Sequence, residues 1–88
     1  MPKTIFQGDH QHLVTVLTEA RHRAELTQVE LARVIGRDQS FVSLFESGQR
    51  RIDVIEFFKL ARALNRDPQE LFAEVAERIG KDIDPIIP

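Results

Sequence analysis

The chain has 88 residues, of which 42% are hydrophobic and 30% are charged, and its formal net charge is -2. This length accommodates one domain with a modest core and excludes a second domain built around a substrate cleft. Without cysteine, neither a disulfide framework nor a thiolate metal site can form. No stretch approaches the length of a membrane span, and the first residues lack the pattern of a secretory signal. We therefore expect a cytoplasmic protein without a membrane partner.

Two helices are predicted in the first half of the chain. After Asp9, apolar residues recur at spacings of three and four and therefore share one helical face: Leu13, Leu17, Ala20 and Ala24. A second helix is expected to begin at Thr27, because Thr27 and Glu30 have the spacing of a capping box. Gly36 supplies a left-handed residue at its end. The residues that flank this start and face inward are Leu26, Leu31, Ala32 and Ile35.

Three further helices follow from the same kinds of signal. Asp38 can cap a third helix, which Ser47-Gly48 ends, and Asp53 opens a fourth through a second capping box with Glu56. Asp67-Pro68 opens a fifth, because proline is favoured in the first turn of a helix. The residues expected to pack inward from these three helices are Val42, Phe45, Ile52, Phe57, Leu60, Ala61, Leu64, Leu71, Phe72, Val75 and Ile79. No segment has β periodicity, so the predicted fold class is all-α, a compact bundle of five helices.

The junction between the second and third expected helices is the most informative feature. Two helices that cross steeply over a short turn need a small residue at their contact, a turn residue that tolerates positive φ, and a branched apolar residue on the second helix. Ala32, Gly36 and Val42 meet these needs in that order. Such a pair of helices is typical of proteins that read DNA, although helical hairpins in adaptor proteins use alanine and glycine in a similar way.

The motif order resembles the lambda-repressor-like (Xre/Cro type) helix-turn-helix family over about residues 13 to 72. The resemblance is carried by LTQVELA at 26–32 with Gly36, QSFVS at 39–43, ESG at 46–48, KLARAL at 59–64 and ELF at 70–72. It implies a five-helix domain that binds operator DNA, commonly as a two-fold dimer, to repress or activate transcription.

The third helix is the candidate reader of DNA bases. If Val42 and Phe45 face inward, its outward face carries Gln39, Ser40, Ser43 and Leu44. Gln39 can pair bidentately with adenine, the two serines can reach base edges or phosphates, and Leu44 can contact a thymine methyl. Many relatives carry a polar or basic residue where this chain has Leu44. A face that merely contacts solvent is the alternative for the two serines.

Four residues are candidates for phosphate contact: Gln28, Arg37, Arg50 and Arg51. Gln28 opens the second helix, and the resemblance implies that this glutamine clamps the DNA backbone. The arginines lie in the turn before the third helix and directly after it, where they suit salt-dependent phosphate contacts. Arg51 has an alternative, an ion pair with Asp53 or Glu56.

The resemblance also suggests a structural ion pair between Glu46 on the third helix and Arg21 on the first. The pI of about 5.9 is unusual for a DNA-binding domain. The charge is uneven, however, because residues 1–51 hold seven Lys and Arg against six acids.

We divide the chain into an N-terminal arm at 1–8, a helix-turn-helix domain at 9–79 and a C-terminal tail at 80–88. The apolar residues of the two ends are a candidate dimer contact, with packing against the first and fifth helices as the alternative: Ile5, Phe6, Ile83, Ile86 and Ile87.

The sequence predicts a small transcriptional regulator, most simply a repressor, which binds double-stranded DNA as a homodimer on a two-fold operator. We expect no enzymatic activity, cofactor or metal, and we interpret His10, His12 and His22 as surface residues. One alternative is an antitoxin that regulates its own operator and binds a toxin through the tail. The other is a protein-interaction module without DNA binding, which the low pI and Leu44 leave open.

Overall fold

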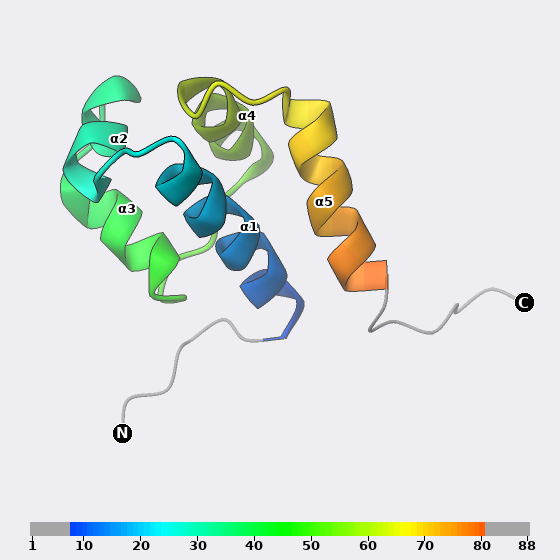
Figure 1. The fold of residues 1–88 in the computed structure, drawn as a ribbon. Coiled ribbons are helices and arrows are strands. Elements are labelled where there is room, and N and C mark those ends of the chain that lie inside the picture. Colours follow the sequence, from blue (N-terminus) through cyan, green and yellow to red (C-terminus); the bar gives the residue numbers. More distant parts are fainter. Residues whose placement is uncertain (1–7, 81–88) are drawn as a thin grey trace, which may run out of the picture.

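The computed structural model describes residues 8–80, and in this range it contains five helices and no strand (Figure 1). The helices are α1 (Asp9–Arg23), α2 (Gln28–Val34), α3 (Gln39–Glu46), α4 (Val54–Ala63) and α5 (Pro68–Gly80). α1 packs against α3 and α5, α2 packs against α3 and α4, and α4 packs against α5. The predicted all-α fold is therefore confirmed. Ile5, Phe6 and the three isoleucines of the tail lie outside the described residues.

Two capping boxes define where α2 and α4 begin. Thr27 Oγ1 accepts the Glu30 amide at 3.1 Å, and the Thr27 amide donates to Glu30 Oε1 at 2.8 Å. The equivalent bonds between Asp53 and Glu56 measure 2.7 and 3.0 Å. Both predicted boxes are confirmed. Asp38 occupies the N-cap position of α3 but makes no side-chain cap bond, so burial of the apolar side of α3 holds this helix instead.

Left-handed glycines end α2 and α3, as the sequence predicts. Gly36 has φ of 72° and Gly48 has φ of 80°. At the end of α2 the Arg37 amide donates to the Ala32 carbonyl at 2.9 Å, and the Gly36 amide donates to the Arg33 carbonyl at 3.1 Å. These two bonds form a Schellman motif, which satisfies carbonyls that the helix itself leaves unpaired. The motif also turns the chain sharply into α3.

The core draws residues from all five helices and differs from the prediction at five positions. Val14 and Val16 of α1 were not expected in the core, yet they are 2% and 4% exposed. Phe41 was not expected in the core, yet it is 4% exposed and packs edge-to-face on Phe45, with ring centroids 5.6 Å apart. Ala24 follows the last residue of α1 and is exposed. Phe72 is 56% exposed, because neighbouring residues of a helix lie about 100° apart and Leu71 takes the inward position. None of the helices within residues 8–80 has the length and apolarity to cross a membrane.

Replacing Gly36 with alanine should lower the free energy of unfolding by about 1–2 kcal/mol, because a Cβ is strained in the left-handed region. An added Cβ would meet no atom within 4 Å, so the cost is conformational and not steric. Urea denaturation measures it. Gly80→Ala is the matched control, since Gly80 has the same free space but a φ outside the left-handed range. Equal effects of the two substitutions would contradict this role of the turn.

Candidate nucleic-acid interface

The α2–α3 unit has the geometry expected from its packing residues. Ala32 and Val42 are 1% and 0% exposed, and Gly36 provides the positive φ of the turn between them. The two helices pack directly against each other. α3 lies at the edge of the molecule beside α2, on the opposite side of α1 from α5 (Figure 1). One side of α3 is thus available to an external partner.

The outward side of α3 carries the four residues expected to read bases. Gln39, Ser40 and Leu44 are exposed and Ser43 is half-buried. The Ser43 hydroxyl donates to the Ser40 carbonyl at 3.3 Å, so it bonds within its own helix. Gln39, at the first position of α3, is instead joined to a chain of polar side chains.

This chain of hydrogen bonds connects α1, α2 and α3. Gln39 Nε2 donates to Gln28 Oε1 at 3.0 Å, and Gln28 Nε2 donates to Glu46 Oε1 at 2.9 Å. Arg21 completes it with a two-pronged contact, in which Nε and Nη2 donate to the two Glu46 carboxylate oxygens at 2.7 and 2.9 Å. We call these four residues the amide relay. Through Gln28, the amide relay holds the Gln39 side chain to the buried Glu46 carboxylate.

The Arg21–Glu46 pair expected from the resemblance is thus present, and it is buried. The two side chains are 10% and 7% exposed. Arg21 also donates to the Leu26 carbonyl at 2.8 Å, and its Nη2 lies 3.2 Å from His22 Nε2. Buried ions of this kind require near-complete hydrogen bonding, because loss of one partner leaves an uncompensated charge. The pair therefore constrains where α3 can sit relative to α1.

A second polar cluster surrounds Glu56 at the start of α4. Glu56 Oε2 accepts from Arg37 Nη1 at 3.2 Å and from Arg50 Nη2 at 2.9 Å, and Oε1 accepts from Arg50 Nη1 at 3.0 Å. The hydrogen bonds from Arg50, together with the bonds to Asp53 and Arg37, lower the pKa of Glu56 to about 2. We call Glu56, Arg37, Arg50 and Phe41 the Glu56 cluster. Its carboxylate is ionised throughout the neutral range.

Phe41 is the apolar member of the cluster. The guanidinium carbons of Arg37 and Arg50 lie 4.1 and 4.7 Å from the centroid of its ring, within the range of a cation–π contact. The stacking of these two arginines on Phe41 was not predicted from the sequence. Helical spacing gave no signal for it, because Arg37 lies in the turn before α3 and Arg50 lies beyond its end.

The structure corrects the expected environment of the arginines. Arg50 pairs with Glu56, whereas the sequence offered Glu56 as an alternative partner for Arg51. Arg37 is also paired with Glu56, so neither arginine simply extends into solvent. Arg51 lies near the start of α1, where burial, and secondarily the charge of Arg51, lower the pKa of His10. Local spacing could not distinguish these partners, because the α3–α4 connection determines which arginine turns toward α4.

Three of the acidic residues lie on the helix farthest from α3, whereas Glu30 and Glu46 lie on α2 and α3 themselves. Glu70, Glu74 and Glu77 lie on α5, which is separated from α3 by α1 (Figure 1). Glu30 is engaged in the capping box of α2 and Glu46 in the pair with Arg21, so the carboxylates of these two helices are occupied within the protein. Within residues 8–80, no group of histidine, aspartate and glutamate side chains is placed to hold a metal ion.

Comparisons with known proteins agree with this geometry. The helix-turn-helix family model matches residues 17–71. An XRE-family like protein from Pseudomonas syringae pv. tomato str. DC3000 is 44% identical, with 80% of this chain and 85% of that chain covered and a TM-score of 0.75. The restriction-modification controller protein C.AhdI from Aeromonas hydrophila is 39% identical, with 73% and 93% covered and a TM-score of 0.67. The clp gene regulator ClgR from Corynebacterium glutamicum, at 18% identity, 86% and 81% coverage and a TM-score of 0.74, shows a likeness of fold. No curated protein matches the chain significantly.

The five-helix fold and its α2–α3 unit define a helix-turn-helix DNA-binding domain. The chain belongs to the XRE-type, lambda-repressor-like helix-turn-helix family of DNA-binding transcriptional regulators.

Proposed function

We propose that the protein is a repressor that binds a two-fold operator as a homodimer, with α3 in the major groove. The observation that supports it most is the amide relay, because it holds the Gln39 amide in one orientation at the exposed first position of α3. A side chain that is already oriented loses less conformational freedom on binding. A merely solvated face would have no need of such a connection to a buried ion pair.

Gln39 has the free hydrogen-bonding groups that adenine requires. Its Nε2 uses one hydrogen on Gln28, which leaves the second hydrogen and the Oε1 acceptor. Adenine presents the N7 acceptor and the N6 donor in the major groove, and a glutamine amide pairs with both. Gln39 can therefore read adenine while its bond to Gln28 persists. Ser40, Ser43 and Leu44 follow on the same side and supply secondary contacts to base edges.

Phosphate contacts are proposed for Gln28, Arg37, Arg50 and Arg51, around the reading helix. Gln28 Nε2 uses one hydrogen on Glu46 and has a second for the DNA backbone. The side chains of Arg37 and Arg50 are 42% and 36% exposed, so part of each guanidinium remains accessible beside Glu56. These contacts set register and add salt-dependent affinity.

Selection of bound duplexes from a random DNA pool tests the proposed function. We expect two half-sites in two-fold symmetry, with centres ~34 Å apart, and an adenine at the position that Gln39 contacts. Gln39→Ala should then cost about 1–3 kcal/mol at that position alone, measured by titration of base-substituted operators. Enrichment of no sequence, or an unchanged base preference for Gln39→Ala, would contradict the proposal.

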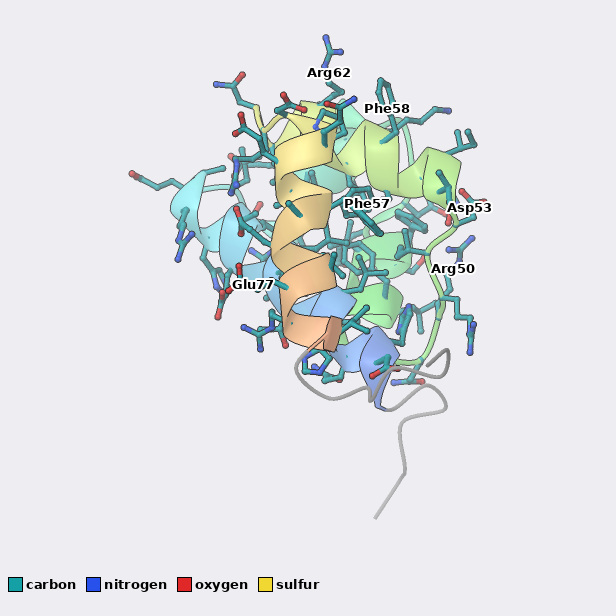
Figure 2. The ribbon with its side chains drawn as sticks, turned by 90° about the vertical axis from the view of Figure 1, so that its right-hand side faces the viewer. Arg50, Asp53, Phe57, Phe58, Arg62 and Glu77 are labelled. Carbon is teal, nitrogen blue, oxygen red and sulfur yellow. The ribbon has the colours of Figure 1, made fainter. Side chains whose placement is uncertain are left out.

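The homodimer is proposed to form through α4 and α5. Val54, Ile55, Phe58 and Phe72 are 80%, 64%, 49% and 56% exposed and gather on these two helices. A groove of about 710 Å³ is lined by three of them, Val54, Phe58 and Phe72, and Phe57 forms part of its wall beside α5 (Figure 2). Apolar surface gathered in this way is typical of interaction sites. We propose a second copy for this position, because Arg51 and Ile52 of the segment after α3 line the same groove, and most soluble homo-oligomers are two-fold dimers.

Ile55→Glu should shift the protein toward monomer, measured by analytical ultracentrifugation without DNA. A glutamate is favourable in the first turn of a helix, so the substitution should not unfold α4. Val29→Glu is the matched control. Val29 is an exposed apolar residue too, at 48%, and it is the second residue of α2, as Ile55 is of α4. Wild-type protein that is monomeric at high micromolar concentration would contradict the dimer. Equal dissociation by both variants would contradict its placement.

A second candidate function concerns which genes are controlled. The likeness to C.AhdI, a restriction-modification controller protein, favours control of restriction-modification genes. Binding of the protein to the promoter of such genes in its own genome would support this role. Selective binding at a promoter beside a toxin gene would instead support the antitoxin hypothesis.

A further inference from the structure

One carboxylate, that of Glu56, receives arginines from both sides of the reading helix. Arg37 comes from the turn before α3, Arg50 follows α3, and Glu56 belongs to the first turn of α4. We propose that Glu56 is a positioning residue that determines specificity, because it keeps Arg37 and Arg50 from engaging phosphates of unaligned DNA. This inference rests on the proposed binding of DNA. It names the group that sets the ratio of the affinity for operator DNA to the affinity for random-sequence DNA.

The geometry restrains both arginines at once. Arg50 makes two hydrogen bonds to Glu56, at 3.0 and 2.9 Å, and its Nη1 also donates to the Arg51 carbonyl at 2.7 Å. Arg37 makes one bond of 3.2 Å to Glu56. Both guanidinium groups rest on the Phe41 ring, which is itself buried in the core. The arginines are therefore held in fixed places relative to α3, unlike flexible surface side chains.

Electrostatics gives this restraint a consequence for DNA binding. Two positive charges share one ionised carboxylate, so the cluster presents a smaller net charge to phosphates than two independent arginines would. Random DNA approaches in many registers and is bound best by flexible, uncompensated cations. An aligned operator is bound best by cations that already stand where its phosphates lie. Glu56 thus weakens random binding more than it weakens operator binding.

The pKa of Glu56, lowered to about 2, makes the restraint independent of pH in the neutral range. The charged groups beside the carboxylate are the two arginines and its capping partner Asp53, and Lys59 lines the same small hollow. Salt is consequently the variable that reveals the effect. The slope of log affinity against log salt changes by about 0.9 for each phosphate that the protein neutralises on duplex DNA.

Glu56→Gln is the direct test, because glutamine can keep the capping box at this position while it removes the charge. We expect the affinity for a random-sequence duplex to rise about threefold to tenfold at low salt, and its salt slope to steepen by up to about one. Affinity for the selected operator should rise less, so the specificity ratio falls. An unchanged ratio in a folded Glu56→Gln protein would overturn the proposal.

Glu30→Gln is the matched control. Glu30 occupies the same position in the capping box of α2, and its replacement changes the net charge equally without touching the Glu56 cluster. It should leave the specificity ratio near that of wild type. A fall as large as that of Glu56→Gln would overturn the proposal, since net charge alone would then explain the effect.

Arg37→Gln provides the test if Glu56→Gln does not fold. A restrained Arg37 serves aligned DNA, so its loss should weaken operator binding by a larger factor than random-duplex binding. Equal factors on the two duplexes would overturn the proposal. Wild-type protein that binds neither duplex would instead refute the proposed function, which separates the two failures.

Discussion

The buried pair of Arg21 and Glu46 is the interaction on which the reading side depends. Two charges withdrawn from water are tolerated only with well-placed hydrogen bonds, and here the carboxylate oxygens receive two from Arg21 and a third from Gln28. The geometry that satisfies the pair also fixes α3 against α1. Gln28 also accepts a hydrogen bond from Gln39. The hydrogen bonds that satisfy the buried pair therefore also orient the exposed amide of Gln39. Stability and base reading are thus linked through the same side chains.

The Glu56 cluster also constrains the position of α3, from its two ends. The amide relay ties α3 to α1 and α2, whereas Glu56 ties the segments before and after α3 to α4. Phe41 lies beneath both arginines and packs on Phe45, so the positions of the cations follow from the core. The helix that reads bases is only eight residues long, and isolated helices of this length are unstable in water. Its position is therefore set by these tertiary contacts.

Local features of the fold could be predicted from the sequence, and features that need a distant partner could not. The two capping boxes and the glycine turns at Gly36 and Gly48 follow from bonds between residues a few positions apart. The exposure of Phe72 and the burial of Phe41 depend on how α5 and α3 rotate against their neighbours.

In the candidate site, too, local features could be predicted and the choice of a distant partner could not. The outward face of α3 was correctly located, and the Arg21–Glu46 pair came from the family resemblance, but the choice of Arg50 over Arg51 as the partner of Glu56 depends on the path of the α3–α4 connection.

Gln28 is central to DNA reading if it holds Gln39 in its reading orientation. A double-mutant cycle measures this directly, with operator affinities for wild type, Gln28→Ala, Gln39→Ala and the double variant. Any phosphate contact of Gln28 adds independently and cancels in the cycle, which leaves the interaction between the two amides. We predict a coupling free energy of about 0.5–3 kcal/mol, as found for residues in one hydrogen-bond network. Effects that add within about 0.5 kcal/mol would show that the two glutamines act separately and would contradict this role of Gln28.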